Sequence, residues 1–156
     1  MKSDKFTLIK CIAIPLIVGG VSAFLSGGGM VVFGALKQPP LSPPGWLFPV
    51  VWTVLYVLMG IASYLVWTSG AEDNVIADAI VLYCYQLTVN FLWPIFFFDF
   101  GWYRFAFFWL LLLWGMVYLT VRTFYNISKP AGYLLIPYLV WVTFAGYLNL
   151  GVWILN

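Results

Sequence analysis

The chain has 156 residues, of which 64% are hydrophobic, 21% aromatic and only 8% charged. Soluble domains carry about 25% charged residues, so this composition excludes a water-soluble globular fold and indicates a membrane protein. Histidine is absent, which removes the commonest metal ligand and the usual general base near neutral pH. No metal site is therefore expected.

The few charges fall in groups, and five charge-free runs separate them. Each run approaches or exceeds the roughly 17 to 25 residues that cross a bilayer as a helix. The runs do not alternate apolar and polar residues, so a transmembrane β-barrel is set aside. We predict an all-α integral membrane protein, a single domain over residues 1–156 built as a bundle of five transmembrane helices. The expected helices are 6–26, 45–68, 77–97, 103–125 and 130–153, and the charge-free runs behind them are 11–36, 38–71, 79–98, 105–121 and 130–156.

The basic residues predict the orientation of the bundle. With five crossings, the N-terminus and the loops at 69–78 and 122–130 share one side of the membrane. That side holds five of the seven Lys and Arg residues, and the other side holds only Lys37 and Arg104. Because basic residues favour the cytoplasmic side, we expect a cytoplasmic N-terminus.

The first connection, 27–44, is longer and stiffer than the others. It begins with glycines and continues as "KQPPLSPPGW" from residue 37, where each proline fixes the backbone φ angle. Long ordered loops often act as lids or binding loops, so we interpret the segment as a lid, with a simple spacer as the alternative. Ser42, just before Pro43, is expected to cap the second helix.

Polar side chains mark one face of the third helix. Gln86 and Asn90 are four residues apart, and Trp93 continues the same face. Amides in lipid need partners, so this face is expected to point into the bundle. It either joins helices together or lines a binding site. Pro94 on this helix and Pro137 on the fifth would free a backbone carbonyl and kink each helix.

Two further helices carry aromatic stripes. The second helix places Trp52 and Tyr56 on one face, and the fifth places Trp141, Ala145 and either Leu148 or Asn149 on one face. Inward indoles next to polar or small residues on three helices suggest an aromatic pocket. A third stripe, Gly19, Ala23 and Gly27, would allow close helix approach within the monomer or in a dimer.

Three stretches carry a resemblance to a known family. They are "ALKQPPLSPPGWLFPVVWTVLYVLMGIASYLVW", "QLTVNFLWPIFF" and "IPYLVWVTFAGYLN", and they resemble the TspO/MBR family in order and spacing. The resemblance implies a five-helix membrane protein, often dimeric, that binds porphyrins such as protoporphyrin IX. It also implies that the connector closes over a pocket.

Carried over by motif, the resemblance assigns residues to that site. The implied pocket residues are Trp52, Tyr56, Asn90, Trp93, Trp141, Ala145 and Leu148, to which the polar stripe adds Gln86, and the implied lid residues are Lys37, Gln38, Pro39, Pro40, Leu41, Pro43 and Pro44. Gln38 and Leu41 replace the lysine and tryptophan that family members commonly carry in the lid. Leu150 and Ile154 interrupt the sterol motif of the animal branch, so a tetrapyrrole is expected rather than a sterol.

Three functions remain open at this stage. The first is a receptor that senses, sequesters or transports tetrapyrroles, and the second is light- and oxygen-dependent porphyrin breakdown with Trp52 and Trp141 as candidate catalytic residues. The third is a small transporter or scaffold without a ligand pocket. The expected partners are membrane lipid, a porphyrin or other hydrophobic small molecule, and a second copy of the chain in the bacterial cell membrane. Neither a required cofactor nor a nucleic acid is expected.

Overall fold

The computed structural model describes residues 4–156, and Lys2 of the orientation argument lies outside them. The described chain is helical with short connections, and its elements are α1 (Lys5–Leu25), α2 (Gly29–Ala35), α3 (Leu47–Trp67), α4 (Asp73–Pro94), the π-helix η1 (Ile95–Asp99), α5 (Tyr103–Ile127) and α6 (Lys129–Leu155). Five of these helical segments, with α4 and η1 counted together, are long and apolar enough to cross a membrane. The predicted all-α class and the five spans are confirmed.

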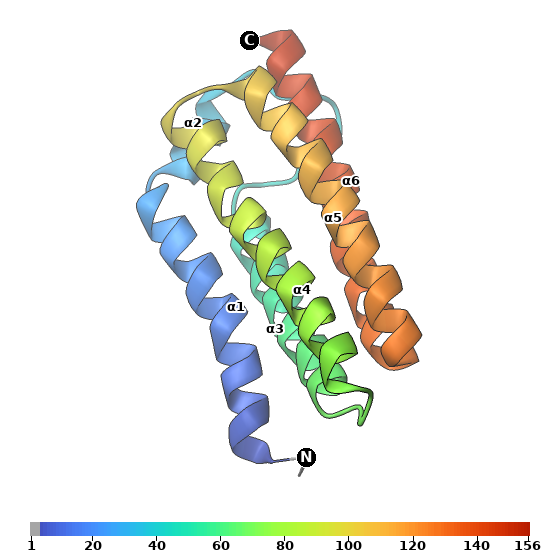
Figure 1. Cartoon of the computed structure of the whole chain (residues 1–156). Coiled ribbons are helices and arrows are strands. Elements are labelled where there is room, and N and C mark those ends of the chain that lie inside the picture. The colour runs from blue at the N-terminus through green and yellow to red at the C-terminus, as the bar shows by residue number, and fades with distance from the viewer. Residues whose placement is uncertain (1–3) are drawn as a thin grey trace.

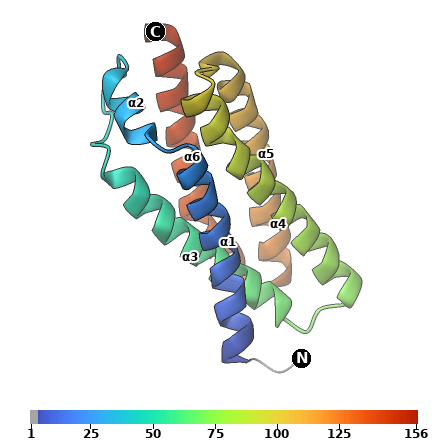
Figure 2. The same cartoon turned by 90° about the vertical axis from the view of Figure 1, so that its left-hand side faces the viewer.

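The five long helices form a closed ring. Around the ring, α1 packs on α3, α3 on α6, α6 on α5 and α5 on α4, and a sparser contact between α4 and α1 closes it. Both views place the N-terminal end of α1 at one end of the bundle and the C-terminus with α2 at the other (Figures 1 and 2). The odd number of spans accounts for this separation of the termini.

Two features stabilise the first helix, one at its N-terminus and one where it packs against α3. Asp4 accepts a hydrogen bond from the Phe6 backbone N–H at 3.1 Å and so caps the start of α1. Farther along, Gly60 of α3 lies directly against the α1 backbone, where an added Cβ would sit 2.7 Å from the Cys11 carbonyl oxygen. Only a residue without a side chain permits this approach.

The connector contains a helix that the sequence analysis did not predict. Residues 29–35 form α2, and the extended proline segment follows it before α3 begins at Leu47. The expected cap at Ser42 is wrong, because the Ser42 hydroxyl donates to the Pro39 carbonyl oxygen at 2.8 Å within a turn. The first turn of α3 instead uses the Pro44 carbonyl, which accepts from the Leu47 N–H at 3.0 Å.

Pro94 ends α4 and the chain continues as the π-helix η1. At this junction the Ile95 N–H donates to the Leu92 carbonyl, and the Phe91 carbonyl accepts from the Ser22 hydroxyl of α1 at 2.8 Å. The disturbed backbone hydrogen bonding at a proline is thus compensated by a side chain from a neighbouring helix. By contrast, α6 continues through Pro137.

Candidate functional site

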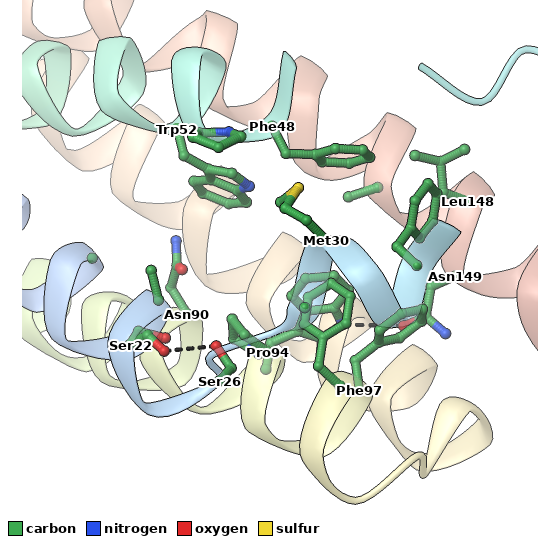
Figure 3. Close-up of a pocket in the computed structure, with 18 of the residues that line it drawn as sticks. Ser22, Ser26, Met30, Phe48, Trp52, Asn90, Pro94, Phe97, Leu148 and Asn149 are labelled. Atoms are coloured by element: carbon green, nitrogen blue, oxygen red, sulfur yellow. Dashed lines mark hydrogen bonds between the residues drawn. The ribbon is translucent and has the colours of Figure 1, made fainter. Parts of the chain in front are cut away.

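A cavity of about 480 Å³ lies at the end of the bundle that carries α2. Its walls come from α1, α2, α3, the α4–η1 junction and α6, and the lining residues are Gly19, Ser22, Ala23, Ser26, Gly28, Gly29, Met30, Val31, Phe33, Phe48, Pro49, Trp52, Tyr56, Asn90, Trp93, Pro94, Phe97, Phe98, Trp141, Ala145, Leu148 and Asn149. Figure 3 shows Met30 of α2 projecting toward Trp52 and Phe48. The short helix therefore covers one side of the cavity.

Aromatic residues make up eight of the 22 residues that line the cavity. Trp52 stacks on Tyr56 with ring centroids 5.6 Å apart, and Trp93 stacks on Phe97 at 5.2 Å. Trp141 meets Phe48 edge to face at 5.9 Å. Such pairs hold one another in place, so the cavity offers preformed flat apolar surfaces for a planar ligand.

The polar atoms around the cavity are mostly paired with one another. The Ser22 and Ser26 hydroxyls donate to backbone carbonyls, and the Trp93 indole N–H donates to Asn149 Oδ1 at 3.0 Å. The Trp141 indole N–H differs, because it is buried without a hydrogen-bond partner among the described residues. An unpaired buried donor is costly unless a ligand or water supplies an acceptor.

Below the cavity, a chain of hydrogen bonds joins three helices. The Tyr56 hydroxyl donates to Asn90 Oδ1 at 3.2 Å, Asn90 Nδ2 donates to the Tyr138 hydroxyl at 2.6 Å, and that hydroxyl donates to Gln86 Oε1 at 2.7 Å. The four side chains are buried. We call this chain the amide relay. Beyond it, Gln86 Nε2 and the Tyr83 hydroxyl are buried without partners among residues 4–156.

The structure brings together seven of the eight predicted pocket residues. Trp52, Tyr56, Asn90, Trp93, Trp141, Ala145 and Leu148 all line the cavity. The eighth, Gln86, lies outside the lining and is joined to it through the relay. The reason is the helical rise of 1.5 Å per residue, which puts Gln86 about 6 Å farther from the cavity than Asn90 on the same face. Whether these residues bind a ligand stays a prediction.

The predicted lid residues lie elsewhere. Among the described residues, none of positions 37–44 lines the cavity. The lid role of Lys37, Gln38, Pro39, Pro40, Leu41, Pro43 and Pro44 stays a prediction. The segment runs along α6. Pro39 fills the space beside Gly151, where an added Cβ would lie 2.5 Å from Pro39 Cγ.

Hydrogen bonds fasten the first half of this proline segment to its neighbours. The Tyr147 hydroxyl donates to the Pro40 carbonyl at 2.6 Å, and Asn156 pairs with the Lys37 backbone through bonds of 3.1 and 2.9 Å. Gln38 Nε2 donates to the Phe33 carbonyl at the end of α2, at 2.8 Å. The segment is thus a strap that ties α2 to α6, and α2 is the element that covers the cavity.

Sequence reasoning missed the contribution of α2 and the role of Tyr138. The seven residues of α2 begin at the third of three consecutive glycines within a charge-free run, so charge and hydropathy do not distinguish them from the first span. Tyr138 precedes Trp141 by three residues on α6, a spacing that places both on neighbouring faces. That spacing was the one feature of the sequence that could have placed Tyr138 near the pocket.

Comparisons with known proteins agree with this architecture. Residues 11–154 match the model of the TspO/MBR family. The chain is 38% identical over 157 aligned residues to the tryptophan-rich protein TspO of Chlorobaculum tepidum, which covers 100% of this chain and 99% of that protein. It is 39% identical to protein CrtK of Rhodobacter capsulatus, over 88% of this chain and 85% of that protein.

An animal protein is similar as well. The translocator protein of Bos taurus is 37% identical over 145 residues, covering 90% of this chain and 84% of that protein. The family match extends through all five spans and both aromatic stripes. The chain is therefore an integral membrane protein of the TspO/MBR family.

Proposed function

We propose that the chain is a membrane binding protein for planar tetrapyrroles, such as protoporphyrin IX, and acts in their sensing, sequestration or transport. The observation that carries the proposal is the preformed aromatic cavity, with Trp52 and Trp141 in its walls. Its volume of about 480 Å³ lies within the range of ligand pockets, about 300 to 1,000 Å³. Burial of a large apolar ring would supply most of the affinity.

The charges of a porphyrin restrict how it can enter. Neither Lys37 nor Arg104, the two cations at this end of the bundle, is among the described lining residues. Ionised propionates would be strongly disfavoured inside the cavity without a partner. We therefore expect the ring to enter with its propionates at the mouth, and an acceptor atom of the ligand to meet the unpaired Trp141 N–H.

Fluorescence titration of the purified protein with protoporphyrin IX tests the proposal. Trp52→Ala and Trp141→Ala should each weaken binding by about 1 to 3 kcal/mol, the scale of aromatic stacking and large-to-small truncation. Trp67→Ala is the matched control, because Trp67 lies at the other end of α3 and is 41% exposed. Unchanged affinity in both cavity variants would eliminate the aromatic pocket as the binding site.

The orientation in the membrane is a second part of the proposal. The start of α1, the α3–α4 connection and the α5–α6 connection lie at the same end of the bundle, opposite α2 (Figure 1). The sequence places five of seven basic residues on that side, which supports a cytoplasmic N-terminus in a bacterial cell membrane. A cysteine introduced at residue 2 should not react with membrane-impermeant thiol reagents in intact cells. Labelling of this cysteine from outside would show that the N-terminus lies outside the cell.

A further inference from the structure

The amide relay fixes which amide atom of Asn90 meets Tyr56 and which meets Tyr138. A tyrosine hydroxyl has one proton to donate. Tyr138 donates its proton to Gln86 Oε1, so toward Asn90 it can only accept. This requirement turns Asn90 Nδ2 toward Tyr138 and leaves Oδ1 facing Tyr56.

The two edges of Asn90 have different surroundings. Tyr56, the partner of Oδ1, lines the cavity, whereas Tyr138, the partner of Nδ2, is 1% exposed and is not among the described lining residues. Asn90 Oδ1 is therefore paired with a residue of the cavity wall and Nδ2 with a residue outside it, and Figure 3 shows the Asn90 side chain beside the cavity below Trp52. Tyr56 has given its own proton to Asn90, so its oxygen offers lone pairs only.

We propose that Gln86, which does not touch the cavity, holds Asn90 Oδ1 and the Tyr56 hydroxyl oxygen as acceptors at the cavity floor, so that the floor favours ligands that present an N–H or O–H group there. The inference rests on the proposed function, because it requires that a ligand binds in the cavity. Gln86 is a positioning residue, because it acts through Tyr138 and Asn90.

The shape of Asn90 alone does not determine its direction. Its amide oxygen and nitrogen are nearly equal in size, so only the partners of each edge distinguish them. If Gln86 offered no acceptor, the Tyr138 proton would turn to Asn90 Oδ1. The Asn90 amide would then rotate and present N–H donors to Tyr56 and the cavity. The hydrogen-bonding character of the floor would reverse without any change in cavity volume.

Two planar probes that differ in one donor measure this character. One is a pyrene carboxamide with an N-butyl group, and the other carries an additional N-methyl group in place of the amide hydrogen. In the wild type the secondary amide should bind roughly three- to ten-fold more tightly than the tertiary amide, the effect of one hydrogen bond. In Gln86→Leu this ratio should fall to about one.

Thr88→Val is the matched control. Thr88 lies at an exposed position of α4 outside the relay, where its hydroxyl donates to the Cys84 carbonyl, so the wild-type ratio should remain. If Gln86→Leu does not fold, Gln86→Met removes the acceptor with an unbranched side chain. Comparing ratios cancels differences between the probes that are unrelated to the relay.

The outcomes separate this inference from the proposed function. An unchanged ratio in Gln86→Leu or Gln86→Met overturns the role of Gln86 while leaving the cavity as a binding site. A loss of the ratio in Thr88→Val as well overturns it too, because the ratio would then fall without any change in the relay. If neither probe binds the wild type or competes with protoporphyrin IX, the proposed binding site fails together with the inference.

Discussion

The two helical walls that face each other across the cavity, α1 and α6, differ in how they are held. Helix α6 has nine buried residues and packs between α5 and α3, whereas α1 has three buried residues, Pro15, Gly19 and Ser22. The α1 wall contributes small side chains and the α6 wall contributes Trp141, Ala145 and Leu148. The cavity therefore combines one wall built into the core with one attached to it from outside.

This difference indicates which wall can move. Packing density in a core resists small displacements, so the aromatic surface on α6 should keep its shape with or without ligand. Helix α1 depends on its approach to Gly60 of α3 and on the hydrogen bond from Ser22 to the Phe91 carbonyl. We expect α1 to be the side at which the cavity opens toward lipid.

The largest expected effect comes from crowding the two walls in turn. Gly132→Val places a Cβ 2.5 Å from Tyr125 Cβ and 2.7 Å from its Cα, within the α5–α6 hairpin. Gly60→Val produces a similar clash with α1. Overpacking costs about 1 to 3 kcal/mol and sometimes more. Thermal unfolding in detergent should show the greater loss for Gly132→Val, because α1 can shift away.

Equal losses in the two glycine variants would contradict the comparison. A valine on a lipid-facing glycine provides the control. Gly115 on α5 has open space around it, with nothing within 4 Å of an added Cβ. Gly115→Val should therefore leave the unfolding temperature nearly unchanged.

A second pair of variants tests the core beneath the walls. Tyr138→Phe removes the hydroxyl at the centre of the amide relay and leaves Asn90 Nδ2 and Gln86 Oε1 without a partner, which should cost about 1 to 3 kcal/mol. Tyr83→Phe removes a buried hydroxyl that has no partner among the described residues, so stability should stay constant or rise. Unfolding in denaturant measures both, and equal destabilisation would show that the relay adds nothing.

The smallest effect on binding is expected from the strap. Replacing Pro43 and Pro44 with Ser should leave the dissociation rate of protoporphyrin IX almost unchanged, because these residues do not belong to the described lining. Met30→Ala on α2 should increase that rate, since it removes a side chain that covers the cavity. Stopped-flow displacement of bound protoporphyrin IX measures the dissociation rate of both variants. If the proline variant released the ligand faster and Met30→Ala did not, the proline segment and not α2 would be the lid.

The sequence was informative where one physical rule dominated. Hydropathy determined the five spans, and the helical period placed Trp52 with Tyr56 and Asn90 with Trp93 on cavity-facing surfaces. The period did not separate Gln86 from the lining residues, because it defines a face and not a depth. The course of the strap along α6 was not predicted, because it depends on contacts with residues more than 100 positions away, such as Tyr147. No local pattern reports such contacts.

The most direct test of the central claim is to fill the cavity. Ala145 lies on the α6 wall among the lining residues and is 6% exposed, so Ala145→Phe should occupy ligand space while α6 stays in place. Ala77→Phe, at an exposed position on α4, is the matched control. Titration with protoporphyrin IX should show affinity reduced at least ten-fold in Ala145→Phe and unchanged in Ala77→Phe. Wild-type affinity in a folded Ala145→Phe protein would contradict the claim that this cavity is the binding site.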